Sequence, residues 1–327
     1  MKTVDVVSIC NALVDILVSV KDSDIERLNL TKGIMHLVDD KKQQAMIDDF
    51  HSQATTTELG GSSLNAIRTL AAIGCKTAFA GMIGKDAFGR TISARMKELG
   101  IEAKLLETQS AATGSCFILV TPDGERTMNT NLGASVMFDE SLVPFDTIEK
   151  SRIFHFCGYQ WGSPQQINAI HKAIEHAKLH KTLVSFDVAD PFVVEASRSD
   201  FIDVIDASAD IVFANQKEAE LLYQGSPEEA CNKICNSGAI AVIKLGKDGA
   251  LIGKGEKRCH IAPKPTTVVD TTAAGDMFAA GFLYGQSVGL GLKESGDIAA
   301  HLASDVISRL GAKVSSEAIA AAKNGLS

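Results

Sequence analysis

The sequence predicts an α/β fold in which helices cover both faces of a mostly parallel central sheet. Three observations support this prediction. Apolar strands alternate with helical segments along most of the chain. Several of these strands are apolar throughout, which is typical of sheets buried on both faces. The chain has 327 residues, 45% of them hydrophobic, enough to bury a large core as one domain or as one domain with an appendage.

The expected elements of the main sheet follow in order along the chain. One helix begins after Gly60-Gly61 and covers 63–73, and another begins at Ser163-Pro164 with proline at its first position. Asp248-Gly249 turns the last strand into a hairpin arm over 250–252. The predicted strands cover residues 4–9, 77–83, 153–157, 183–188, 210–214 and 239–244.

Two segments interrupt this alternation. Residues 13–38 contain short β-like stretches on either side of Lys32-Gly33. A hairpin over 115–120 and 126–130 turns at 122–125. By pattern alone, both segments fit edge strands of the main sheet.

The composition argues against several classes of function. The net charge is −8 and no long basic run occurs, so we expect no nucleic-acid partner. No apolar run approaches membrane-spanning length, and the first residues fit a strand rather than a signal peptide, so we expect a cytoplasmic protein away from membranes. Cys231 and Cys235 lie on a predicted helix without a nearby histidine, so we predict no zinc site. The cysteines are dispersed and odd in number, as in a reducing compartment: Cys10, Cys75, Cys116, Cys157, Cys231, Cys235 and Cys259.

The most informative motif runs from Asp270 to Asp276, Asp-Thr-Thr-Ala-Ala-Gly-Asp. It follows a β-branched run at 266–269 and leads into an apolar helix that includes 277–283. Small residues before a helix leave backbone N–H groups uncovered at the positive end of its dipole, which suits a transferring phosphoryl group. Asp276 lies at the mouth of this socket, where it can accept a proton from an attacking hydroxyl. The same spacing also fits an ordinary strand-to-helix turn with a first-turn carboxylate.

A second motif, from Gly60 to Asn65, opens the helix over 63–73. Gly60 and Gly61 let the backbone approach a ligand closely, and Ser62 and Asn65 offer hydrogen bonds to hydroxyl groups. A Gly-Gly turn that opens a helix needs no ligand, so this motif indicates a binding site only in combination with the first motif.

A third motif, Asn215-Gln216-Lys217-Glu218, follows the predicted strand 210–214. By local rules it is a capping box, with Asn215 as N-cap and Glu218 three residues later. Its place at the carboxyl end of a strand also faces the usual ligand crevice of an open α/β sheet. No Gly-x-Gly-x-x-Gly follows a strand, so a dinucleotide-binding dehydrogenase loses its main support.

The first two motifs resemble the two signatures of the PfkB (ribokinase-like) carbohydrate and nucleoside kinases, and the resemblance spans nearly the whole chain. The N-terminal signature departs from the family pattern at Ser63 and Ile67. The resemblance implies one ribokinase-like domain over 1–327, with a small β lid formed by segments about 13–38 and 113–134. A lid suits a kinase because excluding water limits wasteful ATP hydrolysis.

The resemblance also implies roles for the residues of the motifs. Asp276 would be the catalytic base, and Ala273, Ala274 and Gly275 would form the anion hole with it. Many members have glycine where this chain has Ala273, but the family pattern admits alanine. ATP and Mg²⁺ are the implied cofactors, with the metal held through water by Asn215 and Glu218. The implied ATP-binding residues are Asn215, Lys244, Gly246, Lys247, Gly249, Ala300 and Ser304.

Several segments resemble the adenosine kinase branch of the family. The opening Cys10-Asn11-Ala12-Leu13-Val14-Asp15 matches its Gly-Asn-x-x-x-Asp, with Cys10 in place of glycine. In that branch the aspartate binds the two ribose hydroxyls, and a carboxylate suits a vicinal diol because it can accept both O–H groups. Arg126 resembles a lid arginine that closes onto the phosphates. The substrate-binding residues implied are Asn11, Asp15, Gly60, Gly61, Ser62, Asn65, Cys116, Leu132, Ala134, Tyr159, Gln160, Trp161 and Arg126.

The sequence leaves the substrate open. The register around Tyr159, Gln160 and Trp161 is uncertain by one residue, so the side chain that stacks on the base is open, as are adenosine, inosine and guanosine. A sugar kinase acting on fructose, ribose or a related hexose is the alternative within the family. A non-catalytic ligand sensor on the same scaffold is the alternative from a different class. Activation by a monovalent cation, and the choice between monomer and homodimer, stay open as well.

Overall fold

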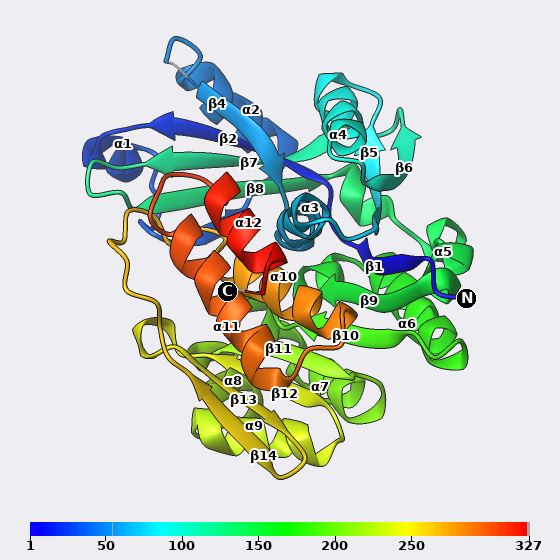
Figure 1. The fold of residues 1–327 in the computed structure, drawn as a ribbon. Coiled ribbons are helices and arrows are strands. Elements are labelled where there is room, and N and C mark those ends of the chain that lie inside the picture. The colour runs from blue at the N-terminus through cyan, green and yellow to red at the C-terminus, as the bar shows by residue number, and fades with distance from the viewer. Residues whose placement is uncertain (54, 326–327) are drawn as a thin grey trace.

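The computed structural model describes residues 1–53 and 55–325, which form two β-sheets and the helices that pack on them (Figure 1). In these residues the larger sheet has the strand order β14 (Lys257–Ile261), β13 (Ala250–Lys254), β12 (Ile240–Lys244), β11 (Ile211–Asn215), β10 (Leu183–Asp187), β9 (Ser151–Cys157), β1 (Val4–Ile9), β5 (Thr77–Gly84), β6 (Glu102–Thr108). The smaller sheet has the order β3 (Met35–Leu37), β8 (Arg126–Gly133), β7 (Thr113–Val120), β2 (Leu13–Ser19), β4 (Thr55–Gly60).

The larger sheet is parallel from β6 to β12, and β13 and β14 add an antiparallel edge. This confirms the predicted mostly parallel sheet, and every strand predicted for it is present within two residues of its expected bounds. Strand β6 was not predicted, because an edge strand with mostly exposed side chains lacks the apolar run that marks its neighbours. The parallel strands end at one edge of the sheet, where they bring together Cys10, Cys157, Asp187, Asn215 and Lys244.

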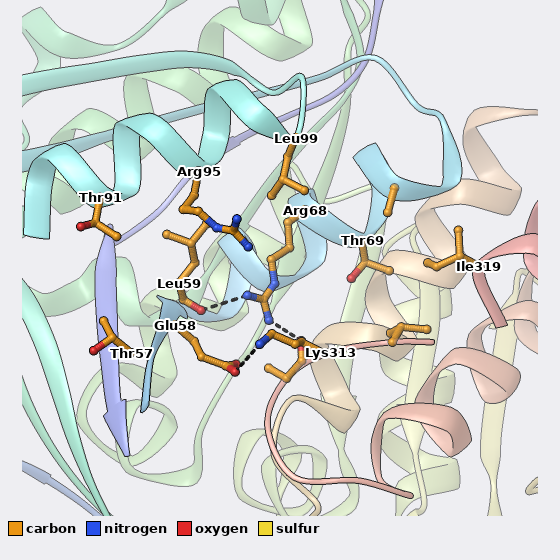
Figure 2. A pocket seen from close by; sticks show the side chains of 13 residues that line it. Thr57, Glu58, Leu59, Arg68, Thr69, Thr91, Arg95, Leu99, Lys313 and Ile319 are labelled. Carbon is orange, nitrogen blue, oxygen red and sulfur yellow. Dashed lines mark hydrogen bonds and ion pairs between the residues drawn. The ribbon is translucent and has the colours of Figure 1, made fainter. Parts of the chain in front are cut away.

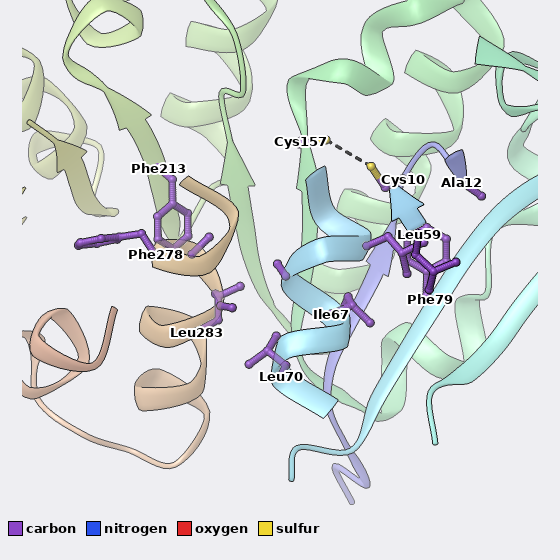
Figure 3. Packing of buried hydrophobic residues seen from close by; sticks show 14 of the residues in the cluster. Cys10, Ala12, Leu59, Ile67, Leu70, Phe79, Cys157, Phe213, Phe278 and Leu283 are labelled. Atoms are coloured by element: carbon purple, nitrogen blue, oxygen red, sulfur yellow. Dashed lines mark hydrogen bonds between the residues drawn. The ribbon is translucent and has the colours of Figure 1, made fainter. Parts of the chain in front are cut away.

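Helices cover both faces of the larger sheet, as predicted. The helices α3 (Ser62–Ile73), α4 (Ala87–Glu98), α10 (Ala274–Ser287) and α11 (Leu292–Val306) contribute to the hydrophobic core on one face. The helices α5 (Phe145–Lys150), α6 (Pro164–Leu179), α7 (Pro191–Ala207), α8 (Gln216–Tyr223) and α9 (Pro227–Asn236) build the core on the other face. Side chains alternate between the two: Phe213 of β11 packs edge-on against Phe282 of α10, whereas Val212 joins the opposite core. Figure 3 shows part of the first core, with Leu283 of α10 on the side of α3, which carries Leu70, and Phe278 on the side of Phe213.

The segments expected to form a small β lid belong to a separate sheet and are not edge strands of the main sheet, the alternative that the pattern left open. The segments 13–38 and 113–134 contribute β2, β3, β7 and β8 to a sheet of their own, and the unpredicted strand β4 completes it. The helices α1 (Asp22–Arg27) and α2 (Asp40–Asp49) carry Ile25 and Met46 into the same core as Val14 and Phe117, so they cover one face of this sheet. Asp15 follows Val14 on β2, so its side chain lies on the opposite face of this sheet. The β-branched run 266–269 forms no strand and lies exposed in a loop before α10.

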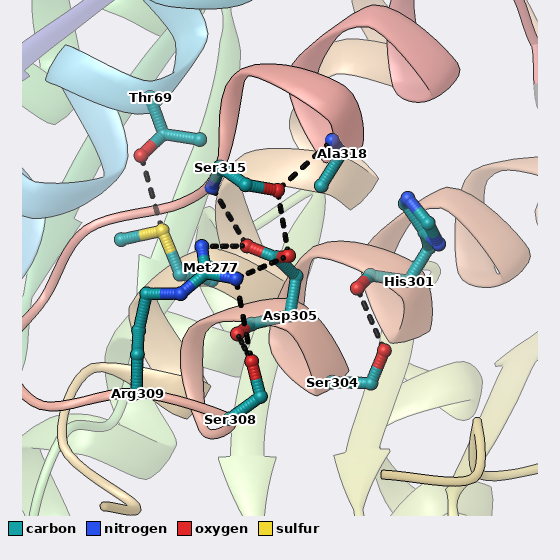
Figure 4. Close-up of polar contacts among 9 residues, drawn as sticks. All are labelled: Thr69, Met277, His301, Ser304, Asp305, Ser308, Arg309, Ser315 and Ala318. Carbon is teal, nitrogen blue, oxygen red and sulfur yellow. Dashed lines mark hydrogen bonds and ion pairs between the residues drawn. The ribbon is translucent and has the colours of Figure 1, made fainter.

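The C-terminal helix α12 (Ser316–Lys323) packs against α3 and α11. Asp305 of α11 pairs with Arg309 and accepts the hydroxyl and the N–H of Ser315, which caps α12 (Figure 4). This network fixes the loop that leads from α11 to α12. Among the described residues, no helix has both the length and the apolar character needed to cross a membrane.

Candidate active site

Helix α10 presents Asp276 in its first turn, directly after the run of small residues. Ala273, the N-cap, has the left-handed backbone conformation with φ 59°, and the helix begins at Ala274. The first N–H groups of a helix have no partner within it, so Gly275 and Asp276 offer donors at the positive end of the dipole. The N–H of Ala274 donates to the carbonyl oxygen of Thr271 at 3.3 Å. A Cβ atom placed on Gly275 would lie 3.1 Å from Nζ of Lys244. The anion-hole backbone therefore lies beside a lysine ammonium group.

Asp276 joins the two signature motifs. Its carboxylate accepts hydrogen bonds from Oγ of Ser62 at 2.7 Å and from Nδ2 of Asn65 at 2.9 Å, both at the start of α3. Gly61, the N-cap of α3, has φ 99°, and a Cβ there would lie 2.5 Å from the carbonyl oxygen of Asn11. A side chain larger than hydrogen is therefore excluded where the backbone of α3 meets the end of β1.

Desolvation by the surrounding protein raises the pKa of Asp276, and the hydrogen bonds from Ser62 and Asn65 act in the opposite direction. The Asp187 carboxylate raises the pKa further, while the Lys244 ammonium lowers it. A carboxylate with a raised pKa is a stronger proton acceptor than a solvated one. Asp276 therefore has both the position and the basicity of a general base for a hydroxyl group.

Asp15 faces the same crevice from the smaller sheet. It lies opposite Glu58 of β4 and Cys116 of β7, and Cys116 accepts a hydrogen bond from Thr130 of β8 at 3.3 Å. The Asp15 carboxylate packs directly over Gly60, where a Cβ atom would overlap it. Burial raises the pKa of Asp15 to about 7, although the nearby Arg68 and Arg126 favour its charged form.

Asn11 and Tyr159 form the floor of the crevice between the two sheets. Nδ2 of Asn11 donates to the carbonyl oxygen of Tyr159 at 3.2 Å, and Oδ1 of Asn11 accepts Nε2 of Gln166 at 2.8 Å. The hydroxyl of Tyr159 donates to Asp190 at 3.2 Å. Leu132 reaches toward this segment from β8, since its Cδ1 would lie 3.3 Å from a Cβ on Gly162.

Three predicted substrate residues lie away from Asp276. Trp161 packs edge-on against Phe201, with ring centroids 4.9 Å apart, in the core on the far face of the larger sheet. Gln160 is buried beside it in the short helix η3 (Gly158–Gly162). Ala134 is also fully buried, at the start of the short helix η1 (Ala134–Met137). The structure therefore brings Tyr159, but not Trp161, to the crevice.

Lys244 lies at the centre of a second group of charged side chains, at the ends of β10, β11 and β12. Its Nζ is 3.2 Å and 3.4 Å from the two carboxylate oxygens of Asp187, and the Lys244 side chain is partly buried while that of Asp187 is buried. The charges of Asp187 and Glu218 raise the pKa of Lys244 against the effect of its burial. The ammonium group therefore stays charged beside Gly275.

Asn215 and Glu218 form the predicted capping box of α8. The Asn215 side chain accepts the N–H of Glu218, and the Glu218 carboxylate accepts both the N–H and the amide of Asn215. Burial raises the pKa of Glu218 to about 7, and the charges of Asp187 and Asp190 add to this rise. For a metal ion, Asn215, Glu218 and Asp187 offer oxygen atoms as ligands. The two carboxylates also carry more negative charge than the single ammonium group of Lys244 balances. Hydrated Mg²⁺ favours oxygen ligands, so these residues fit the metal that the resemblance to the kinase family implies.

The remaining ATP-side residues lie in two places. Gly246 and Lys247 belong to the exposed turn η4 (Gly246–Asp248) between β12 and β13, and Gly249 follows it. Ala300 and Ser304 lie one turn apart on α11, where the hydroxyl of Ser304 donates to the carbonyl oxygen of His301 (Figure 4). Both groups are outside the hydrogen-bond network around Asp276.

Arg126 differs from its expected position at the phosphates. It forms a buried ion pair with Asp270, with exposed side-chain fractions of 7% and 2%. The carboxylate of Asp270 also accepts the N–H of Thr272 and the N–H of Gly311. In this conformation Arg126 thus connects the smaller sheet to the loop that begins the anion hole.

A separate cavity of about 450 Å³ lies behind α3 and does not include Asp276 (Figure 2). Arg68 crosses it from α3 and donates to the backbone carbonyl oxygens of Leu59 and Ala312. Lys313 pairs with Glu58 of β4 across the same space at 2.6 Å. These contacts attach the smaller sheet and the C-terminal segment to the helix that carries Ser62 and Asn65.

The comparisons with known proteins agree with this geometry. The sequence pattern of the pfkB family carbohydrate kinases matches residues 32–319. The chain belongs to this family. A probable sugar kinase protein from Rhizobium etli CFN 42 superposes with a TM-score of 0.92 at 33% identity over 100% of both chains. The adenosine kinase from Sinorhizobium meliloti superposes with a TM-score of 0.90 at 31% identity over 99% of this chain and 100% of that chain. The adenosine kinase of Saccharomyces cerevisiae is 26% identical over 98% of this chain and 100% of its own length.

As a pfkB kinase, the chain is a phosphotransferase that acts on a hydroxyl group, and its fold is ribokinase-like. The family uses ATP and generally Mg²⁺. Two residues of the site had no role in the sequence-based prediction. Asp187 pairs with Lys244, and Asp270 pairs with Arg126. The available signal for Asp187 was its place at the end of an apolar strand, where α/β folds collect ligand-binding groups.

Proposed function

We propose that this chain transfers the γ-phosphoryl group of ATP to the 5′-hydroxyl of a purine nucleoside, with Asp276 as the general base. The observation that carries the proposal is the carboxylate of Asp276 at the start of α10, held by Ser62 and Asn65 of the glycine-rich motif. A base in this position lies between the anion-hole N–H groups and the crevice that Asp15 faces. The adenosine kinase names among the relatives support a nucleoside as acceptor.

The nucleoside would lie between the smaller sheet and the carboxyl edge of the larger sheet. Asp15 would accept hydrogen bonds from the two ribose hydroxyls. Asn11 and Gly61 would contact the sugar from the side of the larger sheet. Of the three residues 159–161, Tyr159 is the one that packs on this side of the sheet, so it would pack against the purine. Leu132 and Cys116 would close the crevice from the smaller sheet, which acts as the lid.

The reaction then needs one proton transfer and one stabilised anion. Asp276 accepts the 5′-hydroxyl proton as the oxygen attacks the γ-phosphorus. The N–H groups of Gly275 and Asp276, and that of Ala274 once it releases the carbonyl oxygen of Thr271, stabilise the charge that spreads over the phosphoryl oxygens. Lys244, beside Gly275, adds a positive charge that needs no reorganisation. Asn215 and Glu218 would hold hydrated Mg²⁺, which neutralises the charge of the ATP phosphates.

The test is the release of ADP by the purified protein with Mg-ATP and a panel of acceptors: adenosine, inosine, guanosine, fructose and ribose. Strong turnover on one nucleoside and little on the sugars supports the proposal and names the substrate. Turnover on sugars alone would mean that the protein is a sugar kinase, the alternative that the probable sugar kinase from Rhizobium etli suggests. Nucleoside binding without ADP release favours a non-catalytic sensor on the same scaffold.

A pair of variants separates nucleosides from sugars. Tyr159→Ala removes the aromatic ring, whereas Tyr159→Phe keeps it and loses only the hydrogen bond to Asp190. Loss of a stacking ring costs about 1–3 kcal/mol per base, so Tyr159→Ala is expected to raise the nucleoside KM by about tenfold or more. An equal effect of both variants, or an equal effect on sugar KM, contradicts stacking by Tyr159.

Two further properties belong to the proposal. Replacing KCl with choline chloride in the same assay tests activation by a monovalent cation. Sedimentation of the purified protein tests whether it is a monomer or a homodimer.

A further inference from the structure

Two cysteine thiols lie in contact at the floor of the crevice. Cys10 follows β1 and Cys157 ends β9, and the parallel register that pairs Ser8 with His155 places these two cysteines opposite each other. Their Sγ atoms are 3.4 Å apart and both side chains are buried, with 3% of Cys10 and none of Cys157 exposed (Figure 3). Two thiols at van der Waals contact on adjacent strands need only a small movement to bond.

The two thiols have different environments. Hydrogen bonds from Cys157, from the hydroxyl and N–H of Ser63, and from the N–H of Asn11 lower the pKa of Cys10 in spite of its burial. The same contact and its own burial raise the pKa of Cys157 well above the usual range. A thiolate is the nucleophilic form of cysteine, so Cys10 is the attacking member and Cys157 the resolving member of the pair.

The other cysteines do not share this environment. Burial raises the pKa of the thiols of Cys75, Cys116, Cys231 and Cys259. Cys231 and Cys235 also lie close together, because both Sγ atoms would contact a Cβ on Gly253, but they belong to α9 on the far face of the larger sheet. They are therefore a matched control pair that is remote from the crevice.

The position of Cys10 and Cys157 links their state to the substrate residues. Asn11 directly follows Cys10, and it donates to the carbonyl oxygen of Tyr159, two residues after Cys157. Ser63 adjoins Ser62, which holds Asp276. A disulfide would shorten the distance between the sulfur atoms from 3.4 Å to about 2.05 Å. Closing this gap of about 1 Å needs the two side chains to turn and the ends of β1 and β9 to approach each other, which displaces the floor of the crevice.

We propose that Cys10 and Cys157 form a peroxide-sensitive thiol pair whose oxidation to a disulfide weakens binding of the substrate. The inference rests on the proposed function only for its effect on activity, because the disulfide itself is detected without any assay of turnover. Cys10 stands where the pattern of the adenosine kinase branch has glycine, so that pattern does not itself supply the pair.

The chemistry balances with hydrogen peroxide as the oxidant. The Cys10 thiolate attacks one peroxide oxygen, the O–O bond breaks, and hydroxide leaves as water after taking a proton, which gives a sulfenic acid. The sulfur of Cys157 then attacks the Cys10 sulfur, the S–O bond breaks, and a second water leaves with the thiol proton. Two thiols and one peroxide thus give one disulfide and two waters. The small exposure of Cys10 favours a small oxidant over a bulky disulfide such as oxidised glutathione.

The experiment treats the fully reduced, full-length protein with hydrogen peroxide and maps its thiols by differential alkylation and mass spectrometry. The expected product is a peptide pair cross-linked between Cys10 and Cys157, reversed by dithiothreitol and not formed with oxidised glutathione. Substrate binding or kcat/KM is expected to fall by about 100-fold in parallel, the usual cost of a displacement of about 1 Å near a reacting group.

Three variants complete the test. Cys10→Ser and Cys157→Ser are each expected to keep their own untreated activity after peroxide, and Cys231→Ser is expected to lose activity as the wild type does. Absence of the cross-link in treated wild type, or loss of activity in Cys10→Ser as in the wild type, overturns the proposal. A cross-link that forms without any change in nucleoside binding overturns the regulatory part and leaves the proposed function untouched.

Discussion

The charge of Asp15 is expected to favour substrate binding and to disfavour folding. Replacing Asp15 with asparagine separates these two effects. A partly buried carboxylate is costly to ionise, yet an ionised carboxylate is the better acceptor for two ribose hydroxyls. Asparagine has almost the same shape and no charge. We therefore expect Asp15→Asn to bind the nucleoside poorly and to resist unfolding better than the wild type above neutral pH.

The magnitude follows from the pKa of Asp15. Burial raises this pKa to about 7 from 3.8, so the folded protein holds the proton more tightly than the unfolded chain does. The free energy of unfolding of the wild type therefore falls as pH rises from about 4 to about 7, where the folded group finally ionises. At 1.36 kcal/mol per pKa unit, the full effect is about 4 kcal/mol. The advantage of Asp15→Asn is expected to grow by about 3 kcal/mol between pH 5 and pH 8.

Urea unfolding of the two proteins without ligand at pH 5, 6, 7 and 8 measures this difference. Asp203→Asn, which removes an exposed carboxylate of α7, is the control and is expected to follow the wild type at every pH. ADP release at pH 8 with the preferred nucleoside completes the comparison. A pH-independent difference between Asp15→Asn and the wild type, or a variant that is less stable at pH 8, refutes the reasoning.

Three further substitutions test the charged groups around the anion hole. Lys244→Met removes the cation beside Gly275, so turnover in the ADP assay is expected to fall by about 10²-fold or more, while Lys244→Arg is expected to lose less. Arg126→Met leaves the buried carboxylate of Asp270 without its partner, which should lower the free energy of unfolding by about 3–5 kcal/mol in urea. If Arg126→Met unfolds like the wild type, the buried pair is not maintained in solution. Glu218→Gln should raise the Mg²⁺ concentration that gives half-maximal turnover by about 10-fold, the usual effect of losing a group that orients a metal ligand. An unchanged Mg²⁺ dependence would show that Glu218 does not belong to the metal site.

The features that could be predicted from the sequence are those encoded by neighbouring residues. The buried parallel strands were predictable because each is a short apolar run between turn residues, and the capping box of Asn215 and Glu218 follows from their spacing. The run of small residues before Asp276 likewise predicts the exposed start of a helix. The contact of Asp276 with Ser62 and Asn65, 214 and 211 residues away along the chain, needed the resemblance to bring the motifs together.

The features that were not predictable depend on distant contacts. Strand β4 exists because it pairs with β2 in an antiparallel register, and its own sequence of three threonines, a glutamate, a leucine and a glycine lacks an apolar run. Trp161 was expected beside the substrate, but a position in a short helical turn does not specify which face of the sheet the side chain takes. The pairing of Arg126 with Asp270 joins the smaller sheet to the loop before α10, and no local pattern marks it.

The central claim is that Asp276 is the general base, and the most direct measurement is the turnover and ligand binding of Asp276→Asn. Calorimetry with the nucleoside and with an unreactive ATP analogue in Mg²⁺ establishes that both still bind. ADP release under saturating substrates then reports the chemical step. We predict binding within a few-fold of wild type and turnover lower by about 10²- to 10⁴-fold, the usual contribution of a general base. Turnover near the wild-type rate, with both ligands bound, would contradict the account.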